Sequence, residues 1–154
     1  MNYAFMYVSI AVVWLIFMVT VQFRKMTLAS ILIGLLSIGY SIAFDVSFGD
    51  HLHLFYYISP EKSTLYIILA AATVYAPLNI IYTMFLPKES RSVLIYTACW
   101  IAGMSIFEFA SVASRTIVFT GWQPIPWSGV VYIAAYTWIY VFYRYLSAKI
   151  PSSG

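Results

Sequence analysis

The sequence predicts an all-α membrane protein, a bundle of five transmembrane helices with the N-terminus outside and the C-terminus cytoplasmic. Three observations support this fold class. Of the 154 residues, 63% are hydrophobic and only 8% are charged, whereas soluble domains carry about 25% charged residues. The apolar residues form five long runs, and the basic residues gather on one side of the resulting topology. A soluble core cannot use so much apolar surface, so lipid is the expected solvent.

Five segments have the length of membrane helices. Each is near or above the roughly 20 residues needed to cross a hydrocarbon core of about 30 Å. Each must be helical in lipid because every backbone polar group needs an internal partner, and the alternation of a β-barrel is absent. We expect a single transmembrane domain over residues 1–154, with the closing PSSG left out of the fold reasoning. Its spans are predicted at about 3–23, 26–44, 63–86, 92–120 and 128–146.

The basic residues set the expected orientation. One side of the membrane receives Arg24, Lys25, Lys88, Arg91, Arg144 and Lys149. The other side receives Lys62, with Arg115 near its membrane edge, and three of the five acids, which are Asp45, Asp50 and Glu61. Because cytoplasmic loops carry an excess of Lys and Arg, the N-terminus is expected outside. The same distribution explains the net charge of +3 without nucleic acid as a partner.

The outer connections are rich in aromatic residues. The longest, 45–62, contains HLHLFYYI, a candidate for a short amphipathic segment on the membrane surface. The connection after the fourth span contains GWQPIPWSG. Its prolines stiffen the turn, and its tryptophans, of which Trp122 is the first, fit an interfacial belt.

Glu108 is the strongest candidate for a functional side chain. It lies roughly 24 Å from the cytoplasmic start of its span, at 1.5 Å per residue. An intramembrane carboxylate is costly and usually faces the bundle interior or a water-filled cavity. Ser105, Ser111 and Arg115 continue its polar stripe. This pattern predicts a proton, cation or polar-substrate site, or alternatively a structural anchor in which Glu108 only holds helices together and Arg115 only reaches the interface.

Asp45 ends the second span after a stripe of small residues. Ser30, Gly34, Ser37 and Ser41 recur at intervals of three or four residues. Such a stripe is typical of close helix packing, and the alternative is a polar groove that leads to Asp45. Because both stripes carry their acids toward the same outer side, Asp45 and Glu108 are candidates for one shared cavity.

Asp50, His51 and His53 form a weak metal motif. Residues two apart point the same way in an extended segment, so both imidazoles could bind one ion. Zinc normally takes three or four N, S or O ligands, and the candidates for the third are Asp45, Asp50 and Glu61. The alternative is a pair of solvated loop histidines that titrate near neutrality.

Other motifs narrow the possibilities. Asn79 follows Pro77 in the third span, where its amide is suited to bond to a neighbouring helix. The chain has no glycine-rich phosphate loop, HExxH, GxSxG or CxxC motif, so we assign no catalytic residue. The cofactor stays unknown, and whether the protein is an enzyme stays open. The candidate ligand-binding residues are Glu108, Asp45, Arg115, Ser105, Ser111, Asn79 and Trp122.

Several segments together resemble a known pattern. They are Asp45 after the second span, YAPLNIIYTMFLP, RSVLIYTACW, Phe107-Glu108, Trp122 and the final YRYL. With these segments the chain resembles an uncharacterised family of small five-helix integral membrane proteins of spore-forming Gram-positive bacteria. The resemblance implies a multi-pass protein of the bacterial cytoplasmic membrane and carries no activity. The family pattern does not include His51 and His53.

Three functions are compatible with these features. In the leading hypothesis, a polar site in the outer half of the bundle binds a small cation, a proton or a lipid headgroup, as part of an oligomeric channel or transporter. Alternatively, the protein is an assembly subunit that docks through its small-residue helix face. In the third, it is a membrane enzyme that acts on a lipid at the outer interface, with Glu108 or Asp45 as general base. The expected partners are the lipid bilayer and either further copies of the chain or other membrane subunits.

Overall fold

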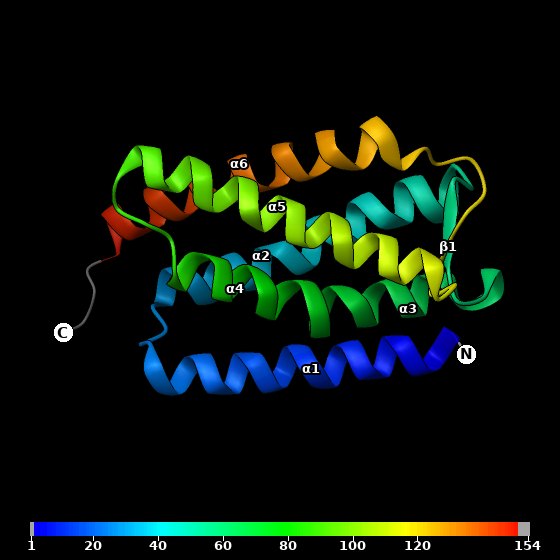
Figure 1. The fold of residues 1–154 in the computed structure, drawn as a ribbon, viewed down its shortest axis with the longest axis horizontal. Coiled ribbons are helices and arrows are strands. Elements are labelled where there is room, and N and C mark those ends of the chain that lie inside the picture. Colours follow the sequence, from blue (N-terminus) through cyan, green and yellow to red (C-terminus); the bar gives the residue numbers. More distant parts are fainter. Residues whose placement is uncertain (1, 151–154) are drawn as a thin grey trace.

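The computed structural model describes residues 2–150, which form five long helical segments lying side by side with a small sheet at one end (Figure 1). The segments that are long and apolar enough to cross a membrane are Tyr3–Phe23, Leu28–His51, Pro60–Met84, Ser90–Ala113 and Pro124–Lys149. The prediction of an all-α bundle of five membrane helices is therefore confirmed, and the chain is a multi-pass membrane protein. The closing PSSG, residues 151–154, lies outside the described residues.

Three of the spans are single α-helices and two are composite. These three are α1 (Asn2–Phe23), α5 (Ser90–Ala113) and α6 (Pro124–Lys149). Near the start of α6, the backbone of Ile125 is non-helical and forms a kink. The second span joins α2 (Leu28–Asp45) to the π-helical segment η1 (Val46–His51). The third span consists of the 3₁₀ turn η2 (Pro60–Lys62), α3 (Ser63–Ala70), the π-helical segment η3 (Ala71–Tyr75) and α4 (Ala76–Met84).

The π-helical turn η3 lets the third span continue through Pro77. A proline lacks the N–H that would bond to the carbonyl four residues earlier, and its ring clashes with that carbonyl. The backbone N–H of Ala76 instead reaches back to the carbonyl of Ala71, five residues earlier. Such wide turns are a common way for a helix to absorb a local irregularity. The span remains continuous and carries Asn79 into the interior, where only 8% of the residue is exposed.

The third span is the centre of the bundle. Half of its most apolar stretch is buried, against 22% or less in each of the other spans. α1 and α2 both pack against α4 and η3, and α6 packs on α2 and α5. The helices that surround the third span expose many large apolar side chains, which in a membrane protein face lipid.

The small-residue stripe of α2 packs against α4 of the same chain. Ser30 and Ser37 are completely or almost completely buried, and a Cβ added to Gly34 would lie 2.6 Å from the Ile80 side chain. The Ser37 hydroxyl donates to the carbonyl of Ile33 at 2.7 Å, so it needs no partner on another helix. The prediction that this face docks a partner or a second copy is therefore wrong, because the chain itself covers it.

A two-stranded antiparallel sheet joins the two outer connections. β1 (Phe55–Tyr57) pairs with β2 (Ile117–Phe119), and Tyr56 lies opposite Val118. Next to the sheet, the carbonyl of Leu54 accepts the backbone N–H groups of residues 120, 121 and 122 at 2.9–3.0 Å. The expectation of an amphipathic surface segment is wrong for the strand itself, since Tyr57 is only 4% exposed, whereas residues 51–53 before it are exposed.

The fourth helix ends before the predicted end of its span at residue 120. α5 stops at Ala113, and Arg115 takes a positive φ of 58°, which turns the chain out of the helix. The residues that follow, Thr116, Ile117 and Val118, are β-branched and favour the extended backbone of β2. Arg115 therefore belongs to a turn at the sheet end of the bundle.

Orientation is testable with two exposed positions at opposite ends. A Cys99→Ala background removes the one native cysteine, so Lys62→Cys and Arg91→Cys would each carry a single exposed thiol. We expect a membrane-impermeant maleimide added to intact cells to label Lys62→Cys, and to label Arg91→Cys only after permeabilisation. The opposite pattern would place the N-terminus in the cytoplasm.

Candidate functional site

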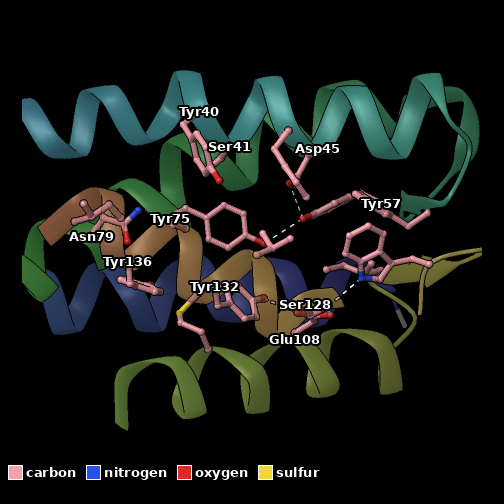
Figure 2. A pocket seen from close by; sticks show the side chains of 18 of the residues that line it. Tyr40, Ser41, Asp45, Tyr57, Tyr75, Asn79, Glu108, Ser128, Tyr132 and Tyr136 are labelled. Carbon is pink, nitrogen blue, oxygen red and sulfur yellow. Dashed lines mark hydrogen bonds between the residues drawn. The ribbon is translucent and has the colours of Figure 1, made fainter. Parts of the chain in front are cut away.

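A cavity lies at the sheet end of the bundle, between α2 and α6 (Figure 2). Its volume is about 120 Å³. Residues of β1 and β2 line one end of it, and residues of η3, α4 and α5 complete the wall. Nearly half of the lining residues are aromatic, namely Tyr40, Phe44, Phe55, Tyr57, Tyr75, Phe119, Trp122, Tyr132 and Tyr136.

Asp45 enters the cavity from α2. Ser41 and Asp45 are four residues apart and so lie on the same helix face. The Tyr57 hydroxyl donates to Asp45 Oδ2 at 3.0 Å and lies 3.0 Å from the Tyr75 hydroxyl. Because the single proton of Tyr57 points to Asp45, Tyr75 donates to Tyr57. Asp45 thus ends a hydrogen-bonded chain that links α2, the sheet and the third span.

Tyr57 is suited to remain a donor in this chain. Burial raises the pKa of the Tyr57 phenol well above its ordinary value, and the neighbouring Asp45 raises that pKa further. Both effects disfavour the charged phenolate. Tyr57 therefore stays neutral and keeps its proton available to Asp45.

Glu108 enters the same cavity from α5, on the opposite side from Asp45 (Figure 2). Ser128 Oγ donates to Glu108 Oε1 at 2.6 Å, and Tyr132 Oη donates to Glu108 Oε2 at 2.5 Å. Both donors come from one face of α6, since they are four residues apart. The Trp122 indole N–H donates to Ser128 Oγ at 2.9 Å and fixes that hydroxyl. Glu108 therefore holds α6 against α5 through two hydroxyl groups.

The cavity is acidic. Asp45 and Glu108 both line it, and among residues 2–150 no lysine, arginine or histidine does. The charged groups close enough to interact electrostatically with Asp45 are two further acids, Glu108 and Asp50. The site therefore brings two acidic side chains together without a basic side chain beside them.

Asn79 also lines this cavity, although only 8% of the residue is exposed. Its side chain is drawn at one end of the pocket in Figure 2. Among residues 2–150, none forms a hydrogen bond with the Asn79 amide, yet neither of its polar atoms is sealed from the cavity. An amide without a partner in the protein is free to bond to whatever occupies the cavity.

The other members of the predicted polar stripe do not line this cavity. Ser105 and Ser111 each donate to the carbonyl four residues earlier in α5, at 3.0 Å and 2.8 Å. Ser105 lines a second cavity of about 150 Å³, which Glu108 and Ser128 also border, and Ser111 lines a third one near α1. Arg115 is exposed in its turn and lines none of the three.

The predicted metal motif lies outside the cavity. His51 and His53 are exposed, and Asp50 accepts a hydrogen bond from Thr64. His53 has a positive φ of 54°, so residues 51–53 are not the extended segment on which the motif depended. Within residues 2–150, no three His, Cys, Asp or Glu side chains are grouped closely enough to hold a metal ion.

Four polar residues of the site were not among the predicted ligands: Tyr57, Tyr75, Ser128 and Tyr132. A signal for two of them is present in the last helix. Ser128, Tyr132 and Tyr136 repeat every four residues and so share one face, and all three line the cavity. The sequence has no comparable signal for Tyr57, which reaches the site only through the sheet.

No family model, curated protein or solved structure matches the chain. The fold and the composition thus support a small polytopic membrane protein, and the family resemblance described above stays a prediction.

Proposed function

We propose that the cavity between α2 and α6 binds a cation. The observation that carries this proposal is the pair Asp45 and Glu108, two carboxyl groups from different helices in one cavity whose lining has no basic side chain. Ionised carboxylates away from water are costly unless a positive charge accompanies them. A bound cation lowers that cost, and so does a proton on either carboxyl group.

Proton and cation are expected to compete for the same two groups. Protonation of Glu108 would turn an acceptor of two hydroxyl donors, Ser128 and Tyr132, into a group that also donates. Because both donors belong to α6, a change in the charge of Glu108 acts directly on the contact between α5 and α6. Occupancy of the site is in this way coupled to helix packing.

The proposal includes the membrane and the side on which the site works. The family resemblance and the distribution of Lys and Arg favour a bacterial cytoplasmic membrane with the sheet end outside. The cavity then lies in the outer half of the bilayer. Assembly with further copies or other membrane subunits, as a channel or transporter, stays part of the proposal.

Substitution of the two acids tests the function. We expect purified wild-type protein in maltoside micelles to gain thermal stability with at least one of Na⁺, Ca²⁺ or choline. Asp45→Asn and Glu108→Gln should each weaken that binding about tenfold, which corresponds to about 1.4 kcal/mol. Both changes keep a carbonyl that accepts from Tyr57, Ser128 or Tyr132, so the fold should survive.

The matched control is Glu89→Gln. Glu89 is an exposed carboxyl group at the other end of the bundle and accepts a hydrogen bond from Ser92 at 3.1 Å. Its substitution should leave cation binding unchanged. Equal binding by the wild type and by the Asp45→Asn/Glu108→Gln double variant would refute the proposal.

A further inference from the structure

We propose that the cation is an ammonium group, belonging either to a free amphiphilic amine or to a lipid headgroup. This inference rests on the proposed function and names the chemistry of the ligand. Four features of the cavity support this inference. They are its aromatic walls, the hydrogen bonds that the carboxylates already accept, the unpartnered amide of Asn79, and the position of the cavity next to the lipid-facing surface of the bundle.

The walls of the cavity suit an organic cation. Aromatic rings attract cations through their electron-rich faces, and several rings around one ammonium group form the usual recognition site for quaternary ammonium ligands. Phe44 and Asp45 are adjacent residues of α2, and Trp122 and Tyr132 border the cavity near Glu108. Charge and aromatic surface thus meet on both sides of the same space.

The carboxylates are poorly placed for a metal ion. Three of their four oxygens, Asp45 Oδ2 and both Glu108 oxygens, already accept hydroxyl hydrogen bonds at 2.5–3.0 Å. Calcium requires six to eight oxygen ligands, and magnesium a near-ideal octahedron. The cavity of about 120 Å³ also exceeds the roughly 15 Å³ that one water or a bare ion of that size needs. An ammonium group needs charge nearby without direct coordination.

Asn79 supplies an independent sign of a polar ligand. The residue is more than nine-tenths buried and lines the cavity, and its amide has no hydrogen-bond partner within residues 2–150. Buried polar groups in proteins are nearly always satisfied. Its carbonyl can accept from an N–H or O–H of the ligand, and its NH₂ can donate to a ligand oxygen.

The cavity also borders the lipid-facing surface of the bundle. Tyr40 lines it and is 39% exposed, and its ring stacks on that of Trp138 from α6 at a centroid distance of 5.8 Å. In a membrane this edge faces the hydrocarbon chains. An ammonium head in the cavity can therefore extend an apolar tail between α2 and α6 into the bilayer.

Choline and its neutral carbon analogue 3,3-dimethylbutan-1-ol test the charge requirement. The full chain in maltoside micelles should bind choline at least tenfold more tightly than the alcohol, measured by isothermal titration calorimetry. The Asp45→Asn/Glu108→Gln double variant should lose this preference. Equal binding of the two probes, or no choline binding by the wild type, would overturn the inference.

Phe44 and Phe48 provide a matched pair for the aromatic requirement. Their rings stack on each other at 4.4 Å, but only Phe44 lines the cavity. Phe44→Leu should weaken choline binding roughly threefold to thirtyfold, the range of a cation–π contact that is partly or fully removed from water. Phe48→Leu should leave it unchanged. The same loss in both variants would contradict a direct ring contact.

Two competition experiments identify the source of the ammonium group. Dihexanoyl phosphatidylcholine that displaces choline, where dihexanoyl phosphatidylglycerol does not, would identify a lipid headgroup as the source of the ammonium group. Displacement by decyltrimethylammonium alone would identify a free amine. Binding of Na⁺ or Ca²⁺ through Asp45 and Glu108 without choline binding would overturn this inference and leave the proposed function standing.

Discussion

Replacing Gly34 with leucine should lower the free energy of unfolding by about 1–3 kcal/mol, the usual effect of forcing extra methylenes into a packed interior. A Cβ at this position would lie 2.6 Å from two carbon atoms of Ile80, and 3.5 Å from the backbone oxygen of Ala76. The rest of a leucine side chain must therefore push α4 away from α2. The measurement is equilibrium unfolding by titration of SDS into mixed micelles, followed by circular dichroism.

Gly39→Leu is the control on the same helix. Gly39 is exposed, and a Cβ added there meets no atom within 4 Å. Both substitutions replace glycine with leucine in a helix and so gain the same intrinsic helix propensity, up to about 1 kcal/mol. The difference between their unfolding free energies therefore reports the cost of packing alone. Gly39→Leu should be neutral or stabilising. Equal stability of the two variants would mean that α2 and α4 do not pack through the small-residue stripe.

Gly34 illustrates which features of the fold can be predicted from the sequence. A run of about 20 apolar residues crosses lipid as a helix, because its backbone polar groups must bond to one another. Composition and run length therefore predict five spans. Small residues at intervals of three and four predict a close helix contact. The pattern cannot name the partner of that contact, because any helix with a complementary surface would fit, and the structure places α4 there.

The two-stranded sheet could not be predicted from the sequence, for a different reason. β1 and β2 have three residues each, and Phe55 pairs with Phe119 across a long separation in the chain. Strands so short have no periodicity to detect, and their pairing depends on the bundle that brings them together. The sheet in turn delivers Tyr57 to Asp45, so an important part of the site depends on a non-local contact.

The polar stripe of the fourth span was extended too far along the chain. Its geometry assumed a helix through residue 120, but α5 ends at Ala113, so Arg115 leaves the face of Glu108. Ser105 and Ser111 lie three residues on either side of Glu108, which places them about 60° to each side of it at 100° per residue. They accordingly border different cavities. Asp45, Glu108, Asn79 and Trp122, by contrast, do line one cavity, and its ligand stays a proposal.

Tyr57→Phe should lower the free energy of unfolding by about 1–3 kcal/mol, because it leaves buried polar groups without their partner. The hydroxyl of Tyr57 lies between two others: it donates to Asp45 and accepts from Tyr75. Its removal leaves Asp45 Oδ2 without its donor and Tyr75 without its acceptor. The ring, which packs among the core residues at the sheet end, is retained.

Tyr75→Phe is the informative comparison, measured by the same SDS titration. This change removes the donor at the end of the chain and leaves the bond from Tyr57 to Asp45 intact. The expected loss is about 0.6 kcal/mol, taking the average for hydrogen bonds between membrane helices as the guide for this bond between a helix and the sheet. A larger loss for Tyr57→Phe would mean that the sheet stabilises the bundle through the carboxyl group of Asp45 as well as through apolar packing. Equal losses would mean that Asp45 finds another donor, and the cavity would then have to be rearranged around it.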